Sequence, residues 1–156
     1  MARPPDNSDP AAWHRHFAME ANNRAWQLSV EPRDLAKDRE MLSAAHASAW
    51  HWALVGTELN HMRAKMLLAE IHALLGHGAT ALAYAREMRE YFLSKADTPD
   101  WELAFTHAVY AHAAHAAGDL VQHRAAYQEA AAAVAAISGE EDRAIVLKTL
   151  RQVAAP

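Results

Sequence analysis

The sequence lacks cysteine altogether and contains only five glycines and six prolines among its 156 residues. Without cysteine the chain has no disulfide, no thiolate nucleophile and no cysteine-ligated zinc or iron–sulfur site. It also lacks a glycine-rich phosphate-binding loop, a dinucleotide-binding fingerprint and a G-x-S-x-G nucleophile elbow. Because no catalytic motif is present, we expect a non-enzymatic protein without a cofactor, while catalysis stays an open question.

An excess of basic residues and long apolar segments are also absent. Lysine and arginine number 15 against 19 acidic residues, which gives a net charge of -4. Nucleic-acid binders usually concentrate basic residues, so we expect no nucleic-acid partner. No segment reaches about 18 apolar residues, and residues 1–10 lack the apolar stretch of a signal peptide. The sequence therefore predicts a soluble, cytoplasmic protein with no membrane partner.

The composition that remains is typical of an all-α protein, because alanine makes up about a quarter of the chain and β-branched residues are few. We expect residues 1–9 to be disordered and residues 10–156 to form a single domain. Prolines, glycines and capping residues divide that domain into seven expected helices, over about residues 10–30, 33–55, 57–75, 79–95, 100–117, 119–137 and 140–154.

Five of these helix starts carry a recognisable cap. Asp9-Pro10, Thr57 and Asp119 each place a good N-capping residue before a helix. Thr98-Pro99 repeats the arrangement of a cap followed by proline before the fifth helix. Ser138 and Glu141 have the S-x-x-E spacing of a capping box before the last helix.

The chain also contains an internal repeat. At an offset of 42 residues, Gly76 aligns with Gly118, Leu68-Ala69 with Tyr110-Ala111, and Ala83 with Ala125. The third and fourth helices therefore form one repeat unit, about 57–95, and the fifth and sixth form a second, about 99–137. Helix pairs of this kind bury their apolar faces by stacking, so we expect the segments 10–55 and 140–154 to cap the array.

The repeat residues resemble those of the tetratricopeptide repeat, although the period of 42 exceeds the standard value of about 34. The stretches 49–85 and 100–137 also resemble an uncharacterised bacterial family of tetratricopeptide-like proteins, which implies no known activity. The resemblance implies antiparallel helix pairs in a short right-handed array, and an up-down helical bundle is the alternative. It rests on Tyr110-Ala111, Gly118-Asp119-Leu120, Tyr127 and Ala130 in the second unit, and on Leu68-Ala69, Gly76, Ala81 and Met88 in the first.

Ten residues are candidates for a partner-binding groove. Three large side chains in succession, Trp50, His51 and Trp52, span about 200° of one helix and cannot all face a single core. In tetratricopeptide arrays the first helix of each pair lines the concave groove. The resemblance therefore implies a protein–protein interaction module, an adaptor or scaffold for a peptide or protein partner. It adds seven groove candidates on the third and fifth helices: Asn60, Arg63, Lys65, Trp101, Glu102, His107 and His112.

The eleven histidines support an alternative function. His112 and His115 lie three residues apart on one helix face, and Glu58 with His61 has the E-x-x-H spacing of di-iron bundles. No second such motif accompanies them, so these four are weak metal candidates. The alternative is a small-ligand- or metal-binding protein that uses the histidine-rich inner helices. A third hypothesis is a structural homodimer with Trp50 or Trp52 in its interface.

Overall fold

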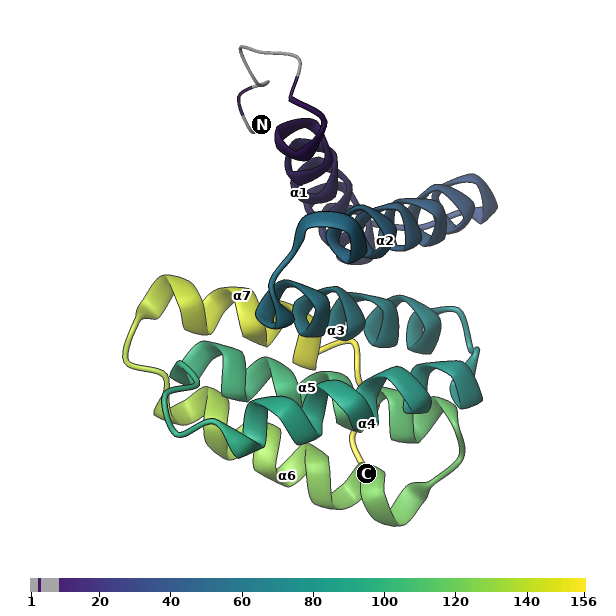
Figure 1. The fold of residues 1–156 in the computed structure, drawn as a ribbon. Helices are drawn as coiled ribbons and strands as arrows, with labels where there is room; N and C mark the ends of the chain where they lie inside the picture. Colours follow the sequence, from purple (N-terminus) through teal and green to yellow (C-terminus); the bar gives the residue numbers. More distant parts are fainter. Residues whose placement is uncertain (1–2, 4–8) are drawn as a thin grey trace.

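The computed structural model describes Arg3 and residues 9–156, and this part of the chain is helical throughout apart from its turns (Figure 1). The seven expected helices are confirmed in number and order, with ends that differ by a few residues. Most of the expected disordered segment 1–9 lies outside the described residues. The helices are α1 (Pro10–Ser29), α2 (Leu35–Val55), α3 (Glu58–Leu74), α4 (Gly78–Ser94), α5 (Asp100–Ala116), α6 (Leu120–Ala136) and α7 (Glu140–Leu150).

Three of the expected N-caps are confirmed. The Asp9 carboxylate accepts from the Ala11 amide, and the Asp119 carboxylate accepts from the Gln122 amide. Thr57 and Asn60 form a reciprocal capping box at the start of α3. At the start of α2, the Asp34 carboxylate accepts a hydrogen bond from the Lys37 amide at 2.9 Å. This fourth cap was not predicted from the sequence. It starts α2 at Leu35 rather than at residue 33.

The other two expected caps are wrong, because the side chains that would have formed them bind other partners. The Thr98 hydroxyl donates to the Phe92 carbonyl at 2.7 Å, so α5 begins without a side-chain cap. The Ser138 amide and hydroxyl both donate to the Asp100 carboxylate, at 3.2 and 3.3 Å. No side-chain capping bond to the start of α7 forms, and its N-cap residue is Gly139.

The helices pack in two layers. Each helix contacts the next one along the chain, an arrangement consistent with antiparallel pairs. In addition, α1 packs against α3, α3 against α5, and α5 against α7, whereas the backbones of α2, α4 and α6 do not approach one another. Between α4 and α6 a long-reaching ion pair forms, from Arg89 to Glu129 at 2.9 Å. The odd-numbered helices therefore form a continuous layer, and the even-numbered helices cover one side of it.

The buried residues form two clusters that divide the molecule unequally. The larger cluster joins α3 to α7 and is centred on α5, which is buried over most of its length. The smaller cluster joins α1 and α2 to α3 through Leu28, Met41, Leu67 and Ile71, among others. The first two helices, called here the α1–α2 hairpin, thus attach to the other five mainly through α3.

The two turns that the 42-residue offset aligns have the same conformation. Gly76 and Gly118 have backbone φ angles of 75° and 76°, in the left-handed region that glycine adopts without strain. The His77 amide donates to the His72 carbonyl at 2.8 Å, and the Asp119 amide donates to the Ala114 carbonyl at 2.9 Å. Both turns are therefore Schellman-type helix ends. Among the described helices, none is long and apolar enough to cross a membrane.

Candidate functional site

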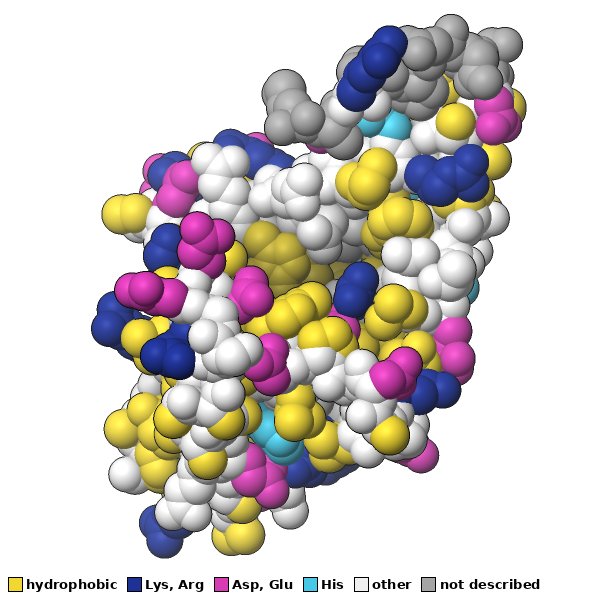
Figure 2. Space-filling model, turned by 90° about the vertical axis from the view of Figure 1, so that its left-hand side faces the viewer, with side chains coloured by type: hydrophobic (Ala, Val, Ile, Leu, Met, Phe, Trp, Pro, Cys, Tyr) yellow, Lys and Arg dark blue, Asp and Glu magenta, His cyan; other side chains and the backbone are white. Residues whose placement is uncertain are grey.

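A pocket of about 450 Å³ opens on the layer of odd-numbered helices. Figure 2 shows a hollowed face of the molecule on which hydrophobic side chains gather. Helices α1 and α7, whose backbones do not approach each other, form its two walls, and α3 and α5 form its floor. The lining residues are Asn22, Trp26, Gln27 and Val30 from α1 and its end, Arg63 and Met66 from α3, Trp101, Glu102 and Phe105 from α5, and Ile145, Lys148 and Thr149 from α7.

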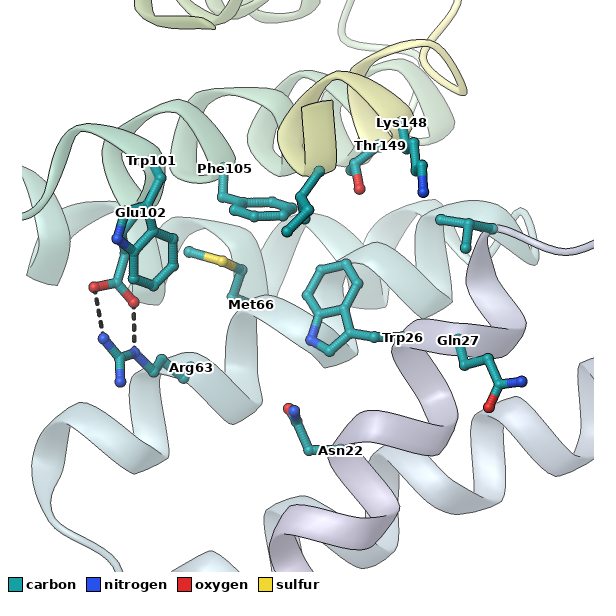
Figure 3. A pocket seen from close by; sticks show the side chains of 12 residues that line it. Asn22, Trp26, Gln27, Arg63, Met66, Trp101, Glu102, Phe105, Lys148 and Thr149 are labelled. Carbon is teal, nitrogen blue, oxygen red and sulfur yellow. Dashed lines mark hydrogen bonds and ion pairs between the residues drawn. The ribbon is translucent and has the colours of Figure 1, made fainter. Parts of the chain in front are cut away.

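The surface of the pocket is mainly apolar, and three of its twelve lining residues are aromatic. The rings of Trp26 and Phe105 have their centroids 5.5 Å apart, so α1 and α5 meet through these two side chains. Trp101 lies one turn before Phe105 on α5, with ring centroids 6.4 Å apart in an edge-to-face arrangement. Met66 of α3 lies between the aromatic groups (Figure 3). Three rings and a thioether give the pocket a large, adaptable apolar surface.

One ion pair lies at the edge of this apolar surface. The Arg63 Nε and Nη2 atoms donate to the two carboxylate oxygens of Glu102, at 2.6 and 3.0 Å (Figure 3). The Glu102 carboxylate is buried, with 2% of its side chain exposed, whereas 42% of the Arg63 side chain is exposed. The hydrogen bond to Glu102 raises the pKa of Arg63. The guanidinium is thus held in place, and its Nη1 atom takes no part in the pair.

Away from Arg63, a hydrogen bond joins the end of α1 to the residues just after α7. The Gln152 side-chain amide, just after α7, donates to the Ser29 carbonyl at 2.6 Å. Lys148 and Thr149 of α7 line the pocket next to this contact. This bond holds the two walls of the open pocket together, and Arg63 lines the pocket beside Trp101 and Glu102 (Figure 3).

Comparison with protein-family models, with curated proteins and with solved structures finds no match for this chain. The pocket therefore has to be interpreted from its own geometry. Its lining contains no histidine, serine, aspartate or tyrosine, and its one carboxylate is engaged by Arg63. The arrangement is suited to holding an apolar group by burial, with Arg63 as a fixed hydrogen-bond donor.

The structure brings three of the predicted groove residues together in this pocket, Arg63, Trp101 and Glu102. Two other predicted groove residues on α3 are used elsewhere. The Asn60 side chain belongs to the capping box of its own helix, and the Lys65 ammonium pairs with Glu87 of α4.

The predicted residues of α2 lie away from the pocket, because α2 belongs to the other layer. Trp50 is 59% exposed, and its ring packs against His14 and His51. The His51 Nδ1 atom lies 2.8 Å from His14 Nδ1 on α1. Trp52 is half-buried, and its carbonyl accepts from the His61 imidazole at 2.9 Å. Of the three large side chains, Trp50 is the one that reaches solvent.

The two predicted histidines of α5 are buried between helices rather than exposed to a groove. His112 Nδ1 donates to the Glu70 carboxylate of α3, with N–O distances of 3.0 and 3.1 Å. Burial opposes the charged form of His112, but the Glu70 charge and hydrogen bond together outweigh burial and raise the pKa. His107 lies 3.1 Å from Glu129 of α6, and burial lowers its pKa despite that carboxylate.

The weak metal candidates are not assembled into a site. Glu58 and His61 belong to the first turn of α3, whereas His112 and His115 belong to the last turns of α5. His115 is exposed and its ring packs on His123 at a centroid distance of 4.9 Å. Over the part of the chain that the structure describes, no three histidine or acidic side chains are grouped to hold a metal ion.

Sequence reasoning missed most of the pocket. Phe105 could have been found, because it follows Trp101 by four residues and therefore shares its helix face. Trp26 and Lys148 were missed for a different reason: they lie on α1 and α7, which the repeat alignment assigns to capping segments. No local pattern indicates that these two helices face each other across α3 and α5.

Proposed function

We propose that this protein is an interaction module that binds a peptide segment or a helix of another protein in the pocket between α1 and α7. One observation carries the proposal: all four odd-numbered helices contribute side chains to a single open, aromatic pocket. Peptide-binding grooves of helical proteins commonly take apolar anchor residues in this way.

The resemblance to tetratricopeptide repeats supports the same function. The layer of odd-numbered helices and the two equivalent glycine turns are features expected of stacked helix pairs. In that interpretation the odd-numbered helices are the first helices of each pair, which line the groove of such arrays. We therefore propose that α3–α4 and α5–α6 are tetratricopeptide-like units with the unusual spacing of 42 residues.

The chemistry of the pocket favours a protein partner. Tryptophan and arginine are the residues most often responsible for binding energy at protein interfaces, and here Trp26, Trp101 and Arg63 lie around one pocket. The Arg63 guanidinium is already immobilised by Glu102, so a partner that accepts a hydrogen bond from it would lose little side-chain entropy. We expect an apolar anchor side chain in the pocket and a backbone carbonyl near Arg63.

The test is to select binding peptides from a random display library on the immobilised protein, and then to measure their affinities by calorimetry. The diagnostic variant is Ile145→Glu, which puts a charge at the apolar rim of the pocket. Ile145 is 53% exposed, so this substitution leaves the fold intact. The control is Val121→Glu, because Val121 is a β-branched residue on α6, 78% exposed and outside the pocket.

We expect the selected peptides to share a large apolar residue, to lose at least about tenfold in affinity for Ile145→Glu, and to keep their affinity for Val121→Glu. Failure to select any peptide would contradict the proposed function. Peptides that lose affinity for Val121→Glu but not for Ile145→Glu would move the binding surface to α6.

The second candidate is a small apolar ligand in the same pocket, because a volume of about 450 Å³ lies in the range of small-molecule sites. This form of the ligand hypothesis uses Trp26, Trp101 and Phe105 in place of the histidines, none of which lines the pocket. A ligand that remains bound to the purified protein in native mass spectrometry, and is lost in Ile145→Glu, would favour it. The cytoplasmic location expected from the sequence stays a prediction.

A further inference from the structure

Three imidazoles form a chain across the junction of α2, α3 and α4, called here the imidazole chain. His72 of α3 is buried in the middle, and its Nδ1 atom lies 3.0 Å from Nδ1 of His77, in the turn before α4. Its Nε2 atom lies 3.3 Å from Nε2 of His46 on α2. His46 and His77 are both exposed, so protons reach the chain from either end.

Each of the two contacts in the imidazole chain needs one N–H donor and one neutral acceptor nitrogen. A neutral imidazole has one N–H donor and one acceptor nitrogen. With three neutral rings, His72 accepts a hydrogen bond at one nitrogen and donates at the other, and both contacts are satisfied. A doubly protonated His72 can still donate to two neutral neighbours, but a second charged ring leaves at least one contact with two N–H donors facing each other and adds electrostatic repulsion. Since His72 uses its two nitrogens in opposite directions, the three rings do not converge on one point as metal ligands would.

We propose that the imidazole chain is a pH-sensitive latch that holds the α1–α2 hairpin against α3 and thereby regulates the pocket. Above neutral pH the chain is intact and the hairpin is closed. On acidification the contact between His46 and His72 breaks, and the hairpin moves relative to α3. The effect of this movement on peptide binding rests on the proposed function, whereas the movement of the hairpin does not depend on it.

The position of the hairpin determines the shape of the pocket. Helix α1 supplies Asn22, Trp26 and Gln27 to one wall, while the floor and the other wall belong to α3, α5 and α7. Beyond the small cluster around Leu28, few side-chain contacts tie the hairpin to the other helices. Besides the His46–His72 contact, they include the packing of Trp26 on Phe105 and three hydrogen bonds. These bonds run from Gln152 to the Ser29 carbonyl, from Arg33 to the Leu74 carbonyl and from His61 to the Trp52 carbonyl.

Among the described residues, no carboxylate contacts His72 to stabilise its charged form. From α2 it meets His46, and from α4 and the turn before it, Tyr84 and His77. Helix α1 packs against this part of α3 through apolar residues. The carboxylate of Glu70, two residues earlier on α3, is bound by His112 of α5. Arg33, before α2, is a further positive charge close to this region.

The sign of the pH effect follows from these environments. Burial, with smaller contributions from His46 and His77, lowers the pKa of His72 below its ordinary value of about 6.5. The unfolded chain therefore binds the proton more readily, so the stabilising contact is fully present above pH about 6.5 and is lost as pH falls through the lowered pKa.

The neighbouring contact between α3 and α5 responds in the opposite sense. The pKa of His112 is raised by Glu70, so the stability from that pair is present below pH about 6.5 and is lost as pH rises through the raised pKa. Acidification thus weakens the attachment of the hairpin to α3 and leaves the joint between α3 and α5 in place. His51 and His107 also have lowered pKa values, so overall stability alone does not isolate the latch.

A distance measurement separates movement of the hairpin from the effects of the other titrating histidines. Because the chain has no cysteine, two spin labels can be attached at introduced cysteines in the otherwise native protein. Asn23→Cys and Glu141→Cys label α1 and α7 on exposed positions across the pocket, and Arg86→Cys with Glu141→Cys labels the body formed by α3 to α7. Pulsed electron paramagnetic resonance would report both distances between about pH 7.5 and about pH 5.

We expect the distance between residues 23 and 141 to shift or broaden below pH about 6.5, while the distance between residues 86 and 141 stays constant. His72→Gln, which keeps hydrogen-bonding groups but does not titrate, should abolish the change. His46→Gln, at an exposed position, provides the same test should the buried substitution not fold. His115→Gln is the control and should behave like the unmodified protein.

An unchanged distance between residues 23 and 141 across this pH range would overturn the proposal. So would a change that persists in both His72→Gln and His46→Gln, or one accompanied by loss of helical circular dichroism, which would indicate general unfolding. Peptide selection at neutral pH tests the proposed function separately, so the failure of one is distinguished from the failure of the other.

Discussion

At the scale of single residues, the buried carboxylate of Glu102 is the most demanding feature of the pocket. A buried charge is tolerated only with a well-placed partner, and Arg63 supplies two hydrogen bonds from a neighbouring helix. The pair therefore fixes the relative position of α3 and α5 at the pocket floor. It also places a cation beside the Trp101 ring, 5.5 Å from its centroid.

We predict that Arg63→Met lowers the free energy of unfolding by about 2 kcal/mol, because it leaves the Glu102 carboxylate buried without a partner. The exposed part of the Arg63 side chain keeps this loss below that of a fully buried pair. Glu102→Gln should cost less, about 1 kcal/mol, since an amide still accepts from Arg63. Urea unfolding measures the free energy of unfolding of both variants.

The double variant Arg63→Met with Glu102→Met is the control for this prediction. It removes the charge together with its partner, so it should be more stable than Arg63→Met alone. A double variant that is as unstable as the sum of the single substitutions would show that the two side chains act independently.

At the scale of helices, the start of α4 packs unusually close to the end of α5. A methyl group added at Gly78 would lie 2.2 Å from the Ala116 carbonyl oxygen and 2.6 Å from the Ala117 Cα atom. These are backbone atoms, so neither can move without displacing a helix end. Gly76, in the turn just before, has open space around it but a φ of +75°.

We predict that Gly78→Ala destabilises the protein by at least about 2 kcal/mol through overpacking. Gly76→Ala and Gly118→Ala should each cost about 1 kcal/mol, because their cost is conformational. Thermal or urea unfolding measures the loss of stability of each variant and so ranks the three substitutions. As a control, Gly139→Ala should stay near the unmodified protein, since its added methyl meets the mobile side chain of Asp142; equal costs at positions 78 and 139 would refute the packing argument.

At the scale of the whole molecule, the two buried clusters predict unequal local stability. The α1–α2 hairpin shares a small cluster with α3, whereas α5 is enclosed by α3, α4, α6 and α7. We predict that amide hydrogen exchange is faster in α1 and α2 than in α5, whose protection should approach that of global unfolding. Exchange measured by mass spectrometry checks this, and equal protection in α2 and α5 would contradict it.

The homodimer expected from the sequence also belongs to this scale. Trp50 lies on the outer side of the hairpin and is the exposed member of the Trp50–Trp52 segment. We predict a dimer at micromolar concentration that Trp50→Glu converts to a monomer, because a charge in an apolar interface is costly. Light scattering measures the molar mass. A monomeric unmodified protein would rule this interface out.

The sequence by itself determined the all-α fold and the order of the seven helices, because capping residues, prolines and glycines act within a few residues of the chain. It determined the caps at Asp9, Thr57 and Asp119 for the same reason. Arg63, Trp101 and Glu102 were singled out by the resemblance to tetratricopeptide repeats, in which the first helix of each pair lines the groove.

Only the tertiary structure decided which groups meet. Ser138 failed as a cap because Asp100, which is distant along the chain, binds its hydroxyl group, and Thr98 failed because its hydroxyl donates back to the Phe92 carbonyl at the end of α4. In the same way, contacts between helices decided that His72 joins two other imidazoles and that His112 binds Glu70. Trp26 of α1 completes the pocket beside Phe105 because α1 folds back over α3. Such pairings depend on distances between helices, which local sequence does not encode.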